Sequence, residues 1–77
     1  MSKKPFIPIL NSSQLSGRRY FPESKTLDLK FKRGDVYSYF EVEQETYTGL
    51  VNSESPGAYF HKKIKTQHTY VKQSNGI

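Results

Sequence analysis

Cysteine is absent from the 77-residue sequence, and this absence limits how the chain can be stabilised. Neither a disulfide nor a thiolate zinc site can form without it. A chain this short buries only a small core, so one domain must be held together by packing alone. The absence of cysteine also favours a cytoplasmic protein over a secreted one.

Long apolar runs are missing as well. The segment from Phe6 to Leu10 is apolar but interrupted by Pro8, which leaves it too short for the core of a signal peptide. No run approaches the roughly 20 residues that cross a membrane. We therefore expect neither secretion nor a membrane partner.

Residues suited to catalysis or metal binding are scarce. His61 and His68 are the only histidines, and no acidic residue follows Glu54 to complete a metal site with them. No serine stands in a recognised nucleophile context. We therefore expect no catalytic residue, no metal site and no cofactor.

Positive charge is in excess, with a net charge of +5, and it is unevenly distributed. Residues 1–20 and residues 55–77 each carry four cations and no acid, whereas residues 21–54 carry seven acids and four cations. If the two basic ends meet in the fold, they form a face suited to a nucleic acid or another polyanion. A charge of this size also serves solubility alone.

The middle of the sequence has the pattern of a β-hairpin. Apolar and polar residues alternate over residues 27–31, and residues 36–40 are rich in β-branched and aromatic side chains. Gly34 lies between the two runs and predicts the turn that joins them.

The length of the hairpin loop decides where Tyr37 and Tyr39 point. A two-residue turn at Arg33 and Gly34 directs both tyrosines away from the apolar face of the preceding strand. A three-residue loop that begins at Lys32 puts Gly34 in a left-handed position and both rings on that face. We favour the longer loop, because arginine is a poor first residue for the type I′ turn that the shorter one needs.

Further strands are predicted on both sides of the hairpin. Two prolines predict an extended arm over residues 1–10, which lies against the sheet or a partner. Residues 15–21 predict a first strand, weakened by Gly17. Residues 68–72 predict a last short strand.

Two short helices are predicted between the hairpin and the last strand. The first covers residues 43–51, where apolar side chains recur at helical spacing. The second opens with Ser55 as its N-cap and Pro56 in its first position. The side chains expected to face the core are Tyr47, Leu50 and Val51 in the first helix and Phe60 and Ile64 in the second.

These elements predict an α+β fold, with a small antiparallel three- to four-stranded sheet and two short helices packed on one face. We expect the domain to span residues 11–72. The arm of residues 1–10 precedes it, and residues 73–77 form a C-terminal tail.

Short motifs follow one another in a fixed order along this domain. They are Ser12-Ser13, Tyr20, Leu27-x-Leu29-x-Phe31, Gly34, Tyr37-x-Tyr39, Val42, Leu50, Ser55-x-Gly57-x-Tyr59-Phe60, Ile64 and Tyr70. This ordered set resembles the KTSC domain family, a short domain found alone in bacterial and phage proteins and at the C-terminus of some lysyl-tRNA synthetases. Phe21 replaces an aspartate common in the family, and His68 replaces a tyrosine. The attachment to a tRNA-charging enzyme implies RNA binding as a function for the family.

Aromatic and basic residues together supply candidate contacts to a nucleic acid. Tyrosine and histidine stack on bases, and lysine and arginine contact phosphates. The candidates are Arg18, Arg19, Tyr59, Lys62, Lys63, Lys65, His68 and Tyr70. Tyr37 and Tyr39 are either a stacking surface or amphipathic core. Ser55 and Gly57 are candidate anion ligands, because free amides at the start of a helix attract anions.

The leading functional prediction is a small non-catalytic module that binds RNA or another nucleic acid through its basic segments. The main alternative is a protein-interaction module, a bacterial or phage accessory factor, that uses the apolar arm at Phe6–Leu10 and the tyrosine face. A nucleotide-type ligand held by the amides of residues 55–58 is a third. We expect a monomer or a weak homodimer.

Overall fold

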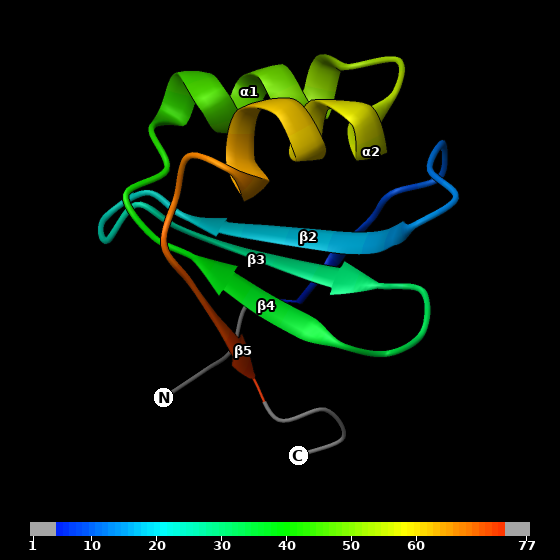
Figure 1. Ribbon diagram of the computed structural model, residues 1–77, viewed down its shortest axis with the longest axis horizontal. Coiled ribbons are helices and arrows are strands. Elements are labelled where there is room, and N and C mark those ends of the chain that lie inside the picture. The colour runs from blue at the N-terminus through cyan, green and yellow to red at the C-terminus, as the bar shows by residue number, and fades with distance from the viewer. Residues whose placement is uncertain (1–4, 74–77) are drawn as a thin grey trace.

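The computed structural model describes residues 5–73, which form a two-layer α+β fold (Figure 1). The strands of one antiparallel sheet follow one another in chain order: β1 (Ile7–Pro8), β2 (Leu15–Phe21), β3 (Thr26–Phe31), β4 (Val36–Tyr39) and β5 (Tyr70–Gln73). Two helices lie on one face of the sheet: α1 (Gln44–Asn52), and a second that starts as α2 (Pro56–Tyr59) and continues as the π-helix η1 (Phe60–Lys65). In the described part of the chain, no helix is long and apolar enough to cross a membrane.

The sheet has five strands, where the sequence predicted three to four. The additional strand is β1, in which Ile7 pairs with Arg18 of β2, so the described part of the predicted arm lies along the edge of the sheet. Residues 1–4 of that arm lie outside the described residues. Pro8 is tolerated there because an edge strand does not need every backbone N–H. Gln73, predicted as the first residue of the C-terminal tail, is instead the last residue of β5, and the remaining tail residues 74–77 lie outside the described residues.

The hairpin between β3 and β4 has the predicted three-residue loop. The Phe31 N–H donates to the Asp35 carbonyl oxygen at 2.8 Å, and the Gly34 N–H donates to the Phe31 carbonyl oxygen at 2.8 Å. Gly34 has a φ of +105°, which only glycine adopts without strain. The register therefore sets Tyr37 opposite Leu29 and Tyr39 opposite Leu27, so both tyrosines share the face that the helices cover.

Strand β2 occupies the predicted range and contains an irregularity between Leu15 and Gly17. This bulge lies at Gly17, the residue that was expected to weaken the strand. The arm also packs closely on Gly17, since a Cβ at this position would lie 3.1 Å from the Phe6 Cβ. The arm is thus held by the packing of the Phe6 side chain on Gly17 as well as by strand pairing.

The core lies between the helices and the sheet. Its buried apolar side chains are Ile9, Leu15, Tyr20, Leu27, Leu29, Tyr39, Val42, Leu50, Phe60 and Ile64. The prediction for Val51 was wrong, because its side chain is 41% exposed. Successive helical residues are rotated by about 100°, so with Leu50 pointing at the core its neighbour faces the flank of α1.

Candidate ligand-binding cleft

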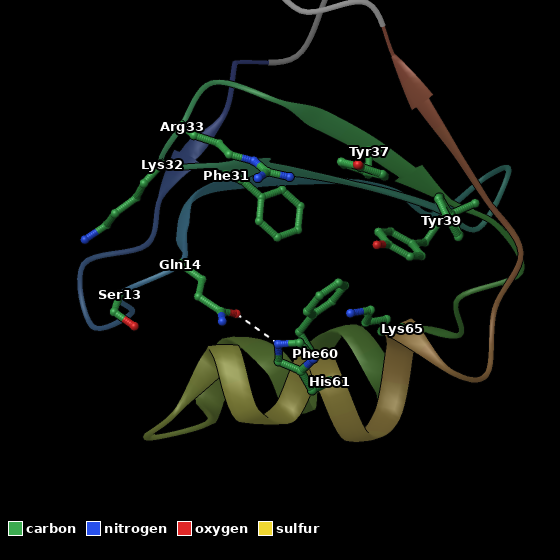
Figure 2. A pocket seen from close by; sticks show the side chains of 11 residues that line it. Ser13, Gln14, Phe31, Lys32, Arg33, Tyr37, Tyr39, Phe60, His61 and Lys65 are labelled. Atoms are coloured by element: carbon green, nitrogen blue, oxygen red, sulfur yellow. Dashed lines mark hydrogen bonds between the residues drawn. The ribbon is translucent and has the colours of Figure 1, made fainter.

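A cleft of about 560 Å³ opens between η1 and the helix-covered face of β3, β4 and β5 (Figure 2). We call it the aromatic cleft. Its walls are the rings of Phe31, Tyr37, Tyr39, Phe60 and Tyr70. Its rim consists of polar and basic side chains from two loops and η1, namely Ser13, Gln14, Lys32, Arg33, His61 and Lys65.

The walls of the aromatic cleft are held in place by contacts between their rings. Phe31 meets Tyr37 edge-to-face at 5.5 Å between centroids and Phe60 at 5.6 Å. Tyr39 meets Phe60 edge-to-face at 5.3 Å. Edge-to-face pairs at these distances are favourable beyond the area they bury, so the walls are preformed.

Tyr37 and Tyr39 differ in their environment. The Tyr39 side chain is 3% exposed and belongs to the core, whereas Tyr37 is half-buried. Burial, with smaller contributions from Tyr70 and Tyr37, raises the pKa of Tyr39 to about 12. Its hydroxyl therefore remains neutral and able to donate a hydrogen bond at any physiological pH.

The rim of the aromatic cleft is cationic. Lys32 and Arg33 come from the β3–β4 loop, and Lys65 comes from η1. The Arg33 Nε lies 2.8 Å from a carboxylate oxygen of Asp35, which holds this guanidinium beside the cleft. No aspartate or glutamate is among the described residues that line it. The arrangement therefore favours a ligand that is flat, aromatic and negatively charged.

A polar pair closes one end of the rim. The His61 Nε2 lies 3.1 Å from the Gln14 Oε1, so the loop before β2 is joined to η1 across the cleft. Figure 2 shows this contact directly below Phe31. The pair places an amide and an imidazole next to the aromatic walls.

Among the predicted nucleic-acid contacts, the structure brings Lys65 and Tyr70 together in the aromatic cleft. Tyr70 is 51% exposed, and its ring lies 5.5 Å from the rings of both Tyr37 and Tyr39. Lys62 and Lys63 are exposed on η1 but do not line the cleft. These two lysines remain predicted phosphate contacts.

The two predicted arginines lie elsewhere, on opposite faces of β2. Arg18 is on the covered face, where its Nη1 donates to the Tyr47 hydroxyl. On the other face, the Arg19 Nε lies 2.8 Å from a carboxylate oxygen of Asp28. Successive strand residues point to opposite faces, so adjacent arginines cannot contribute to one surface of the sheet.

Tyr59 and His68 have structural contacts. A Cβ at Gly49 would lie 2.2 Å from the Tyr59 hydroxyl oxygen, so Tyr59 fills the space that glycine leaves in α1. The His68 Nδ1 lies 3.0 Å from the Phe40 carbonyl oxygen, to which it donates. Both residues help to position the second helix and the segment that leads to β5.

The predicted anion ligands lie beside a smaller hollow of about 290 Å³, lined by Ser55, Gly57 and residues 11–14. Ser55 is the N-cap and Pro56 the first residue of α2, as predicted, but the Ser55 side chain makes no capping hydrogen bond. The Ser55 N–H instead donates to the Ser53 Oγ at 3.0 Å. One of the amides expected to attract an anion is therefore already satisfied.

Sequence reasoning missed most of the rim and part of the walls. Gln14, His61, Lys32, Arg33 and Phe31 were not among the predicted contacts. A signal was present for the loop, because the predicted register already placed two cations beside the Tyr37 face. No pattern indicated that residues 13–14 would meet η1.

Among the described residues, no three side chains of the types that bind metal ions lie together.

Comparison with known proteins identifies related sequences. The KTSC domain model matches residues 11–70. A lysine–tRNA ligase of Nostoc sp. is 42% identical over 62 residues, which cover 80% of this chain and 11% of the ligase. The chain thus spans about a tenth of the ligase's length. An uncharacterized protein of Stutzerimonas stutzeri is 36% identical over 59 residues, covering 77% of this chain and 83% of that protein.

A solved structure shares the fold. The crystal structure of a KTSC domain protein from Yersinia pestis aligns with a TM-score of 0.86 at 23% sequence identity. The alignment covers 91% of this chain and 97% of the other. At this level of identity the match establishes the arrangement of strands and helices alone.

Proposed function

This chain belongs to the KTSC domain family, and on that premise we propose that it is a small non-catalytic module that binds single-stranded RNA. The match to part of lysine–tRNA ligases supports an association with RNA. The observation that carries the proposal is the aromatic cleft, which combines ring-lined walls with a cationic rim. Proteins that bind single strands use this combination, with bases on aromatic rings and phosphates on cations.

Single strands suit the aromatic cleft better than a duplex does. A base paired inside a helix cannot reach a recessed ring, whereas an unpaired base can be turned out of its strand. Lys32, Arg33 and Lys65 then lie where the backbone on either side of the base would pass.

The proposal is tested by fluorescence anisotropy with a labelled single strand and a duplex of the same sequence. Three rim cations predict that the logarithm of affinity falls with the logarithm of salt concentration with a slope of about −2. Lys32→Ala combined with Lys65→Ala removes two of them, and should lower the slope by roughly 1 to 1.5. The matched control is Lys25→Ala with Lys30→Ala, an equal charge change at residues that do not line the cleft.

Two outcomes would contradict the proposal. One is the absence of RNA binding at low salt. The other is an equal loss in both double variants, which would indicate attraction by net charge alone. The salt dependence of RNA affinity is also compared in Lys62→Ala with Lys63→Ala, because these exposed lysines lie on the same helix as Lys65 but outside the aromatic cleft.

A second candidate function, a protein-interaction module, is favoured by a different observation. Leu10 is 91% exposed and lines a shallow hollow of about 220 Å³ with Val51, which is 41% exposed. The simplest partner is a second copy of this chain, which sedimentation velocity would detect. Leu10→Ser should then abolish dimer formation and leave RNA affinity unchanged. If sedimentation velocity shows a monomer at all concentrations, self-association through this hollow is ruled out.

A further inference from the structure

We infer that the aromatic cleft holds a single unpaired base, with the phosphate of the same nucleotide on the Lys32–Arg33–Lys65 rim. The inference rests on the proposed function and specifies which part of an RNA strand the cleft recognises. It also allows a free mononucleotide as the ligand, since the chemistry that is recognised is the same. The cleft volume of about 560 Å³ lies within the range of roughly 300–1,000 Å³ found for small-molecule sites.

The arrangement of rings determines where a base can lie. Tyr37 and Tyr70 are 5.5 Å apart between centroids and tilted by 46°. A base between two parallel rings needs about 7 Å, twice the contact distance of carbon atoms. The two tyrosines therefore leave no slot between them. Together they form one wall, and a base would stack on its surface that faces η1.

The opposite side of the cleft supplies the remaining contacts. In Figure 2, Phe60 projects from η1 toward the sheet, Lys65 extends along the helix toward Phe60, and His61 lies on the side of Gln14. Phe60 closes the depth of the cleft through its contacts with Phe31 and Tyr39. A base that enters from the rim is thus bounded by rings on the sheet side and by Phe60 at the bottom.

Polar groups at the mouth distinguish a base from an aliphatic ligand. The pair of Gln14 and His61 lies at the rim, where the hydrogen-bonding edge of a base would lie. An amide both donates and accepts hydrogen bonds, as the edges of bases do. The tyrosine hydroxyls on the sheet side add further polar atoms. The aromatic cleft therefore has the mainly apolar walls and few polar groups of a specific small-molecule site.

The cations place the phosphate. Lys32 and Arg33 lie on the loop side of the aromatic cleft, and Lys65 lies on η1. Asp35 holds Arg33 by its Nε, and the guanidinium has four other N–H donors for a phosphate. A nucleotide that stacks its base on Tyr37 and Tyr70 can then set its phosphate between the loop and the helix. A base alone would use only the aromatic rings, and a phosphate alone would use only the rim cations.

The test compares ligands that share charge but differ in bases. An eight-residue oligoadenylate and an inorganic polyphosphate of similar charge are titrated into the wild-type protein, together with AMP and ribose 5-phosphate. We expect oligoadenylate to bind at least tenfold more tightly than polyphosphate, and AMP more tightly than ribose 5-phosphate. If AMP binds as tightly as the oligomer, the site recognises a free nucleotide, which also supports the inference.

Variants locate the base. Tyr70→Leu and Tyr37→Leu should each lower the affinity for oligoadenylate by roughly 5- to 100-fold, the usual effect of removing a stacking ring. Polyphosphate affinity should not change. Phe21→Leu is the matched control, an equivalent loss of a ring at a residue that does not line the aromatic cleft. The comparison of ligands on the wild-type protein does not depend on whether the variants fold.

The outcomes separate this inference from the proposed function. If RNA binds but polyphosphate binds equally well, and the tyrosine variants behave like Phe21→Leu, the base does not enter the cleft and only the inference fails. If neither RNA nor AMP binds at low salt, both fail.

Discussion

The two faces of the sheet are stabilised in different ways. On the face that the helices cover, apolar and aromatic side chains pack against one another and form the aromatic cleft. On the opposite face, hydrogen bonds cross four strands. Arg19 donates to Asp28, Ser38 donates to Asp28 at 2.6 Å, and Gln73 donates to Ser38. We call these four residues the polar network.

Because of this difference, we expect the residues that stabilise the fold to be distinct from those that bind a ligand. The polar network contains Asp28 and Ser38, which are 3% and 5% exposed, so each needs its partners to remain satisfied. The outer part of the aromatic cleft has no such requirement, because Tyr37 is half-buried and Tyr70 is half-exposed. Residues of the outer part of the cleft can therefore change with little effect on folding, whereas Asp28 and Ser38 of the polar network cannot.

The largest expected effect comes from breaking the polar network. Asp28→Ala removes one partner of Arg19 and one partner of Ser38, and should lower the free energy of unfolding by about 3–5 kcal/mol. Urea unfolding at neutral pH measures the loss. Asp28→Asn keeps an acceptor for Ser38 and should lose less. A loss below about 1 kcal/mol for Asp28→Ala would mean that the two faces do not differ as described.

On the covered face, the stability should depend on alkaline pH through Tyr39. Its pKa is about 12 in the folded protein and 10.0 without burial, so the folded state holds the proton more tightly. This contribution is complete below pH 10 and is lost as pH rises from about 10 to 12, a change of about 2–3 kcal/mol. Unfolding measured from pH 8 to 12 should show the decline.

Tyr39→Phe is the test of that assignment. The variant lacks the ionisable group, so its stability should fall less steeply above pH 10. Some decline should remain, because burial also raises the pKa of Tyr20. An unchanged pH dependence in Tyr39→Phe would show that the buried hydroxyl is not the cause.

The sequence predicted the assignment of residues to these faces better than it predicted the cleft. Alternation over residues 27–31 and the position of Gly34 were sufficient for the register, because side chains in a strand alternate with a period of two. The cleft depends instead on how far η1 lies from β4 and β5. That distance follows from the packing of Phe60 on Phe31 and Tyr39, which are far apart in the sequence. Local patterns contain no information about such contacts.

A smaller effect should follow from a change in the loop that sets the register. Gly34→Ala places a Cβ in open space but forces an L-residue to a φ of +105°, so only backbone strain opposes it. We expect a loss of about 1–2 kcal/mol in the free energy of unfolding. Gly34→Asn, which tolerates positive φ, should lose less.

The same variant examines the assignment of faces directly. Nuclear Overhauser effects between Tyr39 and Leu27 should persist in Gly34→Ala, because a shift of one residue would move every core side chain of β4 to the opposite face. If those contacts disappeared while the protein stayed folded, the loop alone would determine the register. The burial of Tyr39 would then not contribute to it.

The smallest expected effect concerns the arm on the open face. The Arg19 guanidinium lies 4.3 Å from the centroid of the Phe6 ring, and the Lys30 ammonium lies 5.8 Å from it. Phe6→Leu keeps an apolar side chain but removes the ring, and should cost about 0.5–1 kcal/mol. Phe6→Tyr keeps the ring and is the control. If both variants lost the same amount, the ring would not matter; a loss as large as that of Asp28→Ala would mean that the arm, rather than the polar network, stabilises this face.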